Sequence, residues 1–191
     1  MGSNMTSTSQ AGQDVYAHIL SGKISQGGFV DIGCNDATFH SNSAALEFIG
    51  WVGVLVDIAP VCVGRRSPFV CCDATRPSDA LLAQYAALPP VLGYLSVDCD
   101  EATLGALQAF PFDKVQCQSI TTEHDRYRLG DGPRNAIRKF LFELGYELVC
   151  ADVVAEGYGE FEDWWAYPRW SSRGVRDQLR SQSKIGKEIV K

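Results

Sequence analysis

Residues 29–57 read FVDIGCNDATFHSNSAALEFIGWVGVLVD, and this stretch decides the fold. It begins with a short apolar run at 29–33, continues through a helix-like segment at 42–49 that Gly50 ends, and finishes in a second apolar run at 51–57. Nearly continuous apolar runs suit parallel strands that are covered on both faces. We therefore predict a strand–helix–strand unit of a parallel sheet.

The same alternation of strands and helices continues along the chain. Further strands are expected at 69–72, 91–97, 115–122, 146–154 and 161–167, and helices at 13–21, 77–88, 101–110 and 133–144. Strands that alternate with helices of about ten residues indicate an α/β sheet with helices on both faces. The last two strands are expected to close the sheet as an antiparallel pair.

Length and composition are those of an ordinary globular domain. The 191 residues are 46% hydrophobic and 21% charged, and no apolar stretch reaches the roughly 20 residues of a membrane span. We expect residues 1–10 to be disordered or left over from cloning. Residues 11–168 should form one domain, and residues 169–191 a tail or helix.

Charge is distributed unevenly along the chain. Residues 169–191 carry seven Lys and Arg against two Asp and Glu, so this segment has a net charge of +5 within a total of −6. The acidic remainder is unsuited to nucleic-acid binding driven by bulk charge. The basic segment is expected to be solvated, or to fold over an anionic ligand or partner.

The seven cysteines bear on the cellular compartment. They form no C-x-x-C pair, their number is odd, and no secretory signal precedes them. Free cysteines in apolar runs behave as small hydrophobic residues. We therefore expect a reducing, cytoplasmic compartment.

Acidic residues follow the carboxyl end of each of the five predicted parallel strands. They are Asp31 and Asp36, Asp57, Asp73, Asp98 with Asp100 and Glu101, and Glu123 with Asp125, in the order of the strands. Turn formation explains one or two such residues, because Asp is a common turn former. Ligands of open α/β sheets bind beyond the carboxyl ends of the strands, so five acidic ends predict a binding site there.

The loop after the first strand indicates which ligand this site would take. A dinucleotide site would have the pattern G-x-G-x-x-G, but only Gly33 is present, and Asn35 and Thr38 replace the other two glycines. A pyrophosphate therefore cannot approach the backbone closely. Asp57 lies 24 residues beyond Gly33, where it can accept hydrogen bonds from a ribose diol. S-adenosylmethionine, an adenosine without phosphates, fits better, and its cationic groups suit an acidic rim.

Seven segments together resemble the FkbM-type family of S-adenosylmethionine-dependent methyltransferases. They are FVDIGCNDA at 29–37, SNSAALE at 41–47, GWVGVLVDIAP at 50–60, LSVDCDEATLGAL at 95–107, TTEHDRYR at 121–128, FLFELGYELV at 140–149 and FEDWWAYP at 161–168. The resemblance implies a Rossmann-like class I methyltransferase fold. Its sheet would have seven mostly parallel strands, with the last strand antiparallel.

The resemblance also implies which residues bind the cofactor. They are Asp31, Gly33, Asn35, Asp57, Ile58, Asp73 and Ala74. The first three would line the methionine part of the cofactor. Asp57 would hold the ribose hydroxyls, and Asp73 and Ala74 would lie beside the adenine.

The ends of the fourth and fifth strands are the expected catalytic centre. By similarity to magnesium-dependent sugar and catechol O-methyltransferases, Asp98, Glu123 and His124 would hold Mg²⁺ or Mn²⁺. The ion would lower the pKa of an acceptor hydroxyl, and Asp100 or His124 would take its proton. The alternative is a metal-free site in which Glu123 and His124 bind the cofactor or backbone and His124 is the base.

The predicted activity is methylation of a saccharide hydroxyl by an S-adenosylmethionine-dependent enzyme. The alternatives are a nucleic-acid methyltransferase that uses the basic tail, which the acidic site disfavours, and a cofactor-binding or partner-binding module without catalysis. The expected partner is a saccharide or glycan acceptor, with homodimer formation left open.

Two pairs of residues bear on the acceptor. Arg126 and Arg128 could bind an anionic group, or could be solvated. One of Trp164 and Trp165 could form a platform for a sugar ring, although core packing is the commoner role for both.

Overall fold

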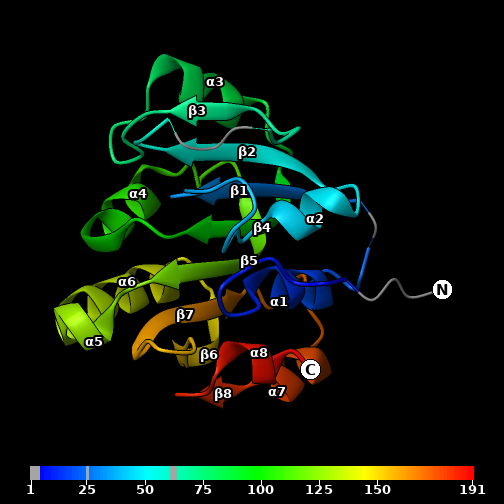
Figure 1. Cartoon of the computed structure of the whole chain (residues 1–191), viewed down its shortest axis with the longest axis vertical. Helices are drawn as coiled ribbons and strands as arrows, with labels where there is room; N and C mark the ends of the chain where they lie inside the picture. The colour runs from blue at the N-terminus through cyan, green and yellow to red at the C-terminus, as the bar shows by residue number, and fades with distance from the viewer. Residues whose placement is uncertain (1–4, 25, 61–63) are drawn as a thin grey trace.

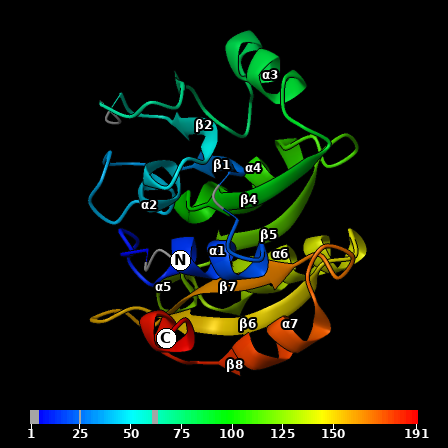
Figure 2. The ribbon, with the colours of Figure 1, turned by 90° about the vertical axis from the view of Figure 1, so that its right-hand side faces the viewer.

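A single sheet of eight strands organises the chain (Figure 1). The structure is a computed structural model that describes residues 5–24, 26–60 and 64–191. The strands are β1 (Gly28–Ile32), β2 (Val52–Asp57), β3 (Phe69–Cys71), β4 (Val91–Val97), β5 (Gln116–Glu123), β6 (Glu147–Val154), β7 (Glu160–Ala166) and β8 (Ser181–Gln182). Their order in the sheet is β3-β2-β1-β4-β5-β7-β6-β8. Figure 1 and Figure 2 both show the strands from β2 to β8 in this order from top to bottom.

The prediction of a mostly parallel α/β sheet is confirmed, but the predicted number of seven strands is wrong. The additional strand, β8, comes from the predicted basic tail and pairs in parallel with β6, with Ser181 opposite Cys150. The antiparallel strand is β7, which lies between β5 and β6. A two-residue strand at a sheet edge has no apolar run that would mark it in the sequence.

Helices cover both faces of the sheet. They are α1 (Gln13–Leu20), α2 (Ala44–Phe48), α3 (Asp79–Ala86), the 3₁₀ helix η1 (Asp100–Ala102), α4 (Thr103–Ala109), α5 (Arg126–Leu129), α6 (Asp131–Glu143), α7 (Arg173–Leu179) and α8 (Gly186–Ile189). Side chains of α3, α4 and α6 share one core with Val30 and Ile32 of β1. Side chains of α1 and α2 share a second core with Phe29. Successive residues of β1 therefore point into opposite cores, which explains its continuous apolar sequence.

The segments at both ends of the described chain pack onto this framework. Ser7, Thr8 and Ser9 all hydrogen-bond to the buried Asp14 of α1, and Ser9 forms a β-bridge with His40. Residues 5–10 thus lie against the domain, whereas residues 1–4 of the predicted N-terminal segment lie outside the described residues. No helix in the described ranges is both long and apolar enough to span a bilayer.

The C-terminal segment covers apolar surface of the sheet. Leu179 of α7 is buried in a core that also contains Val149 and Val153 of β6. Arg176 of α7, also largely buried, donates to Glu147 Oε2 at 2.8 Å. The predicted tail therefore contributes to the core of the domain.

Leu179→Ala is expected to destabilise the protein by about 2–4 kcal/mol, because it leaves a cavity under β6. The measurement is the free energy of unfolding in urea. Leu82→Ala on α3 is the matched control, since Leu82 is half exposed and its truncation should have a much smaller effect. Equal small effects of the two variants would show that α7 does not stabilise the sheet.

Candidate functional site

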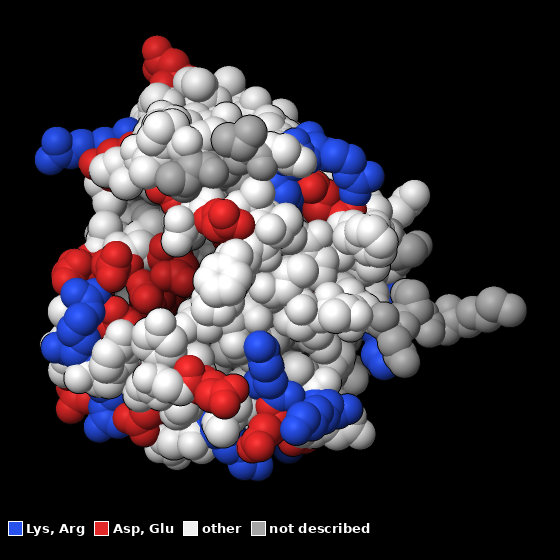
Figure 3. Space-filling model, in the orientation of Figure 1, with Lys and Arg blue, Asp and Glu red and all other residues white. Residues whose placement is uncertain are grey.

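A cavity of about 650 Å³ opens at the carboxyl ends of the parallel strands. Its size is typical of sites for small molecules. Eight carboxyl side chains line it, namely Asp31, Asp57, Asp73, Asp98, Asp100, Glu101, Glu123 and Asp125. Figure 3 shows Asp and Glu gathered in and around a hollow on the side where these strands end. Acidic residues after five different strands thus share one site.

Asp57 connects the end of β2 to the loop after β1. Its Oδ2 accepts a hydrogen bond from the Asn35 amide at 2.9 Å, and its Oδ1 accepts one from the Ala59 amide at 2.9 Å. Each carboxylate oxygen has a second acceptor position. The carboxylate can therefore hold this loop and still accept hydrogen bonds from a diol.

Gly33 allows the ends of β1 and β4 to approach each other. Its φ of 79° lies in the left-handed region, and a Cβ built on it would lie 1.7 Å from the carbonyl oxygen of Asp98. Its amide donates to the Val56 carbonyl at 2.8 Å. Glycine is therefore required here because two backbone segments meet at this point.

Asp31 is buried at the base of the cavity. Its Oδ2 accepts a hydrogen bond from the Ser43 hydroxyl at 2.5 Å. Burial raises the pKa of Asp31, while the Ser43 hydrogen bond and the charge of Arg65 lower it. Two opposing effects thus act on the ionisation of this carboxyl.

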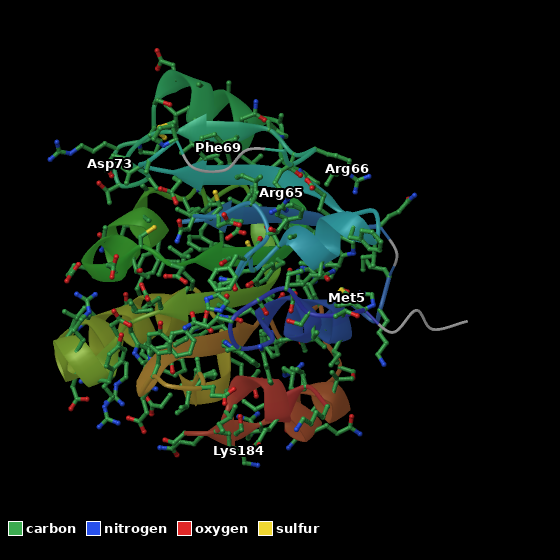
Figure 4. The ribbon with its side chains drawn as sticks, in the orientation of Figure 1. Met5, Arg65, Arg66, Phe69, Asp73 and Lys184 are labelled. Carbon is green, nitrogen blue, oxygen red and sulfur yellow. The ribbon has the colours of Figure 1, made fainter. Side chains whose placement is uncertain are left out.

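Arg65 organises the loop between β1 and α2 (Figure 4), a role that sequence reasoning missed. Its guanidinium donates to Glu47 Oε2 at 2.9 Å, to the Ala37 carbonyl at 3.1 Å and to the Ser43 hydroxyl at 3.2 Å. Because Ser43 in turn binds Asp31, Arg65 supports this carboxylate from a distance. No local pattern marks it, since its partners lie 18 to 28 residues away in sequence.

The residues expected beside an adenine lie along the ends of β2 and β3. Asp73 (Figure 4) accepts hydrogen bonds from the hydroxyl and amide of Thr75 at 2.7 and 2.9 Å, and these bonds lower the pKa of Asp73. Ala74 is buried and Ile58 is exposed, and both line the cavity. They give this part of the cavity an apolar surface beside a carboxylate.

Asp98 and Glu123 form a hydrogen-bonded carboxyl pair at the ends of β4 and β5. Glu123 Oε2 also accepts a hydrogen bond from the Asp100 amide at 2.7 Å. Burial raises the pKa of both carboxyls, and the charge of Asp98 raises that of Glu123 further. The carboxyl pair therefore holds a proton more tightly than an isolated carboxyl would, as expected for two close acidic groups.

His124 does not line this cavity. Its ring is buried on the other side of the sheet, where Nε2 lies 3.5 Å from Asp163 Oδ1 and 3.9 Å from Asp152 Oδ1. Successive side chains of a strand point to opposite faces, so Glu123 and His124 diverge. The structure thus does not bring together Asp98, Glu123 and His124 as ligands of one metal ion.

The acidic groups beside Glu123 also do not fit a metal ion. Ligand atoms of Asp100, Glu123 and Asp125 lie within 4.8 Å of one another. However, the Arg128 guanidinium binds both Asp100 and Asp125 at 2.7 Å, and it binds Glu101 at the same distance. Arg128 therefore already provides the positive charge that a metal ion would supply there.

The two arginines and two tryptophans singled out in the sequence do not line the cavity. Arg126 forms ion pairs with Asp131 and Glu160, as Arg128 does with the three carboxylates above. Trp164 and Trp165 are both fully buried in the two cores. The aromatic side chains that do line the cavity include Tyr127 and Tyr158, which sequence reasoning missed.

Comparisons with known proteins concern the fold. No protein-family model and no curated protein matches the sequence. A solved structure from Pyrococcus horikoshii, described as "a putative RNA methyltransferase", matches with a TM-score of 0.51 and 10% identity. The match covers 82% of this chain and 83% of that chain. It supports a methyltransferase fold but not the FkbM-type family in particular. The chain therefore has an α/β fold similar to that of this structure, with eight strands in its own sheet.

Proposed function

We propose that this protein is an S-adenosylmethionine-dependent methyltransferase that acts on a saccharide hydroxyl. The observation that carries the proposal is the placement of Asp57 and the carboxyl pair around one cavity at the carboxyl ends of the strands. Asp57 offers hydrogen-bond acceptors for a ribose diol, and the carboxyl pair offers an acceptor for a proton. The fold is one in which such a site is expected at this edge of the sheet.

The residues around the cavity fit this cofactor. Asp57 would hold the ribose hydroxyls, with Asp31, Gly33 and Asn35 near the methionine part. Ile58, Asp73 and Ala74 would receive the adenine. The excess of carboxylates suits the cationic ammonium and sulfonium groups. When bound, the cofactor supplies an electrophilic methyl group.

The carboxyl pair is the proposed general base. A hydroxyl must lose its proton as it becomes a nucleophile, and a carboxylate with a raised pKa accepts that proton more readily. Asp100, the base expected from the sequence, is exposed and bound to Arg128. Its carboxylate is therefore already occupied by a cationic partner.

The basic C-terminal segment gives little support to a nucleic-acid acceptor. Arg176 and Arg180 both pair with Glu147, and Arg173 pairs with Asp177. Several of its charges are therefore neutralised within the domain. Stronger binding of RNA or DNA at low salt than at high salt, together with methylation of that nucleic acid, would favour this alternative.

Asp57→Ala is expected to weaken binding of S-adenosylhomocysteine at least about tenfold, because hydrogen bonds to a charged group contribute roughly 1.5–3 kcal/mol each. Isothermal titration calorimetry measures the affinity. Asp113→Ala is the matched control, because Asp113 is exposed and does not line the cavity. Thermal unfolding shows whether each variant keeps its fold.

The outcomes of this titration are distinct. Unchanged affinity in Asp57→Ala would remove Asp57 from the cofactor site. Absence of binding to the intact protein would favour a partner-binding module without catalysis and overturn the proposed function.

A further inference from the structure

Exposed aromatic side chains line the cavity that also contains the carboxyl pair. Tyr127 of α5 and Tyr158 of the β6–β7 connection are 50% and 49% exposed, and their ring centroids lie 6.4 Å apart at an interplanar angle of 71°. Phe39 stacks on His40 at 3.9 Å in the β1–α2 connection, and Phe39 is 70% exposed. Exposed aromatic surface within a concave site is typical of ligand binding.

The position of Tyr127 is fixed by its neighbours. Arg126 binds Asp131 and Glu160 on one side of it, and Arg128 binds residues of η1 on the other. Helix α5 is therefore held to both β7 and the end of β4. A tyrosine fixed in this way loses little further freedom when a ligand binds.

The β6–β7 connection approaches Tyr127 closely. A Cβ built on Gly159 would lie 2.5 Å from the Cβ of Tyr127, so only glycine allows this approach. The same connection carries Tyr158, whose amide donates to the Ala155 carbonyl at 3.0 Å. The two tyrosines therefore belong to one fixed part of the cavity, although they lie 31 residues apart in sequence.

The charges of the cavity exclude an anionic ligand beside these rings. Eight carboxyl side chains line the described cavity, and its described lining contains no Lys or Arg. The two nearby arginines of α5 are occupied by the protein's own carboxylates. A phosphate group beside these rings would be repelled by the carboxylates nearby. An uncharged ring can place its apolar face on an aromatic side chain and direct its hydroxyls to carboxylates.

We propose that Tyr127 and Tyr158 form an acceptor subsite for an uncharged saccharide ring, and that sugar phosphates and nucleotide sugars are excluded from it. This inference rests on the proposed function. The subsite holds the ring so that one hydroxyl reaches the carboxyl pair. Tyr127 and Tyr158 act as binding residues and take no part in proton transfer.

The test measures saccharide binding to the protein saturated with S-adenosylhomocysteine. Saturation-transfer NMR with the methyl glycosides of common hexoses, deoxyhexoses and pentoses should show binding, whereas the corresponding sugar 1-phosphates and uridine diphosphate sugars should not bind. For the glycoside that binds most tightly, Tyr127→Ala and Tyr158→Ala should each weaken affinity about fivefold or more. S-adenosylhomocysteine affinity should remain that of the unaltered protein.

Two kinds of control make the result specific. Tyr127→Phe and Tyr158→Phe keep the ring and should retain most of the glycoside affinity. Phe48→Ala removes an exposed aromatic side chain that does not line the cavity. It should change neither the glycoside affinity nor the S-adenosylhomocysteine affinity. In turnover assays the two alanine variants should raise the KM for the acceptor more than they lower kcat.

The possible failures can be told apart. Binding of S-adenosylhomocysteine without binding of any neutral glycoside would overturn the subsite and leave the cofactor assignment intact. Equal or tighter binding of the phosphorylated sugars would overturn the exclusion of anions. Unchanged glycoside affinity in both alanine variants would overturn the role of the tyrosines. Only absence of S-adenosylhomocysteine binding would count against the proposed function itself.

Discussion

The double variant Asp98→Asn/Glu123→Gln is expected to lose about 10²- to 10⁴-fold in the rate of methyl transfer, which is the usual contribution of a general base. Both substitutions preserve shape and hydrogen bonding, so cofactor affinity should be retained. Single-turnover transfer from labelled S-adenosylmethionine to the best acceptor measures the chemical step. If Asp100→Asn alone abolishes turnover and the double variant does not, Asp100 is the base.

The pH profiles of the single variants provide a second measurement. In the unaltered protein the pKa values of the carboxyl pair are raised, so the rate should increase as the pH rises through neutral. Each single substitution removes the neighbouring negative charge, which lowers the pKa of the remaining carboxyl. The increase in rate with pH should therefore occur at lower pH in each single variant. An unchanged pH profile would show that the carboxyl pair does not control the rate.

The same pKa shifts allow lost chemistry to be separated from a lost fold. A carboxyl with a higher pKa in the folded state favours folding most at low pH, and this contribution is lost as the pH rises through the folded-state value. The amide side chains of the double variant Asp98→Asn/Glu123→Gln do not titrate, so this contribution to the pH dependence of stability is absent. At alkaline pH the double variant should therefore unfold at a higher temperature than the unaltered protein, even though it is inactive.

The metal-dependent alternative makes a different prediction. Activity in excess EDTA should be retained, because Arg128 already pairs with Asp100 and Asp125 and because His124 lies outside the cavity. Loss of activity in EDTA and its recovery with Mg²⁺ would contradict this expectation.

Gly33→Ala is expected to destabilise the protein by more than about 4 kcal/mol, which is a larger loss of stability than most single substitutions cause. The added methyl group would meet the backbone carbonyl of Asp98 at 1.7 Å, and no side-chain rotation can relieve this contact. Urea unfolding measures the loss. The cofactor site should be lost with the fold, because Gly33 lies between Asp57 and Asp98.

Gly22→Ala separates the two effects that act at Gly33. Gly22 has a φ of 77°, nearly that of Gly33, but a Cβ there would meet nothing within 4 Å. Its substitution therefore measures the cost of a left-handed alanine alone, about 1 kcal/mol. Equal losses of unfolding free energy in Gly33→Ala and Gly22→Ala would contradict the close approach of β1 and β4.

Local patterns in the sequence predicted the parallel strands and the placement of the acidic residues. Each strand from β1 to β4 combines an apolar run with an acidic residue after it, and the more polar β5 ends in Glu123. These features can be read within about ten residues. Asp31, Asp57, Asp73 and Asp98 therefore lie at one edge of the sheet, as a parallel arrangement requires. The direction of His124 was misjudged, although strand alternation beyond Glu123 would have indicated it.

Long-range contacts account for what could not be predicted. Arg65 binds residues on α2 and on the loop before it, and β8 pairs with a strand about 30 residues earlier. Tyr127 and Tyr158 come together only because β7 lies beside β5. Contacts of this kind depend on the completed sheet and leave no periodic signal in the sequence.

The position of β7 between β5 and β6 has a consequence for the order of folding. Because β6 precedes β7 in the chain, β5 keeps an unpaired edge until β7 is available. The β6–β7 hairpin has a connection of five residues, so it can form locally and then dock on β5 as a unit. Tyr158 lies in that connection, and Glu162 of β7 lies opposite Glu123. During synthesis, the part of the cavity that the ends of β1 to β4 line would therefore be in place before the part that Tyr158 lines.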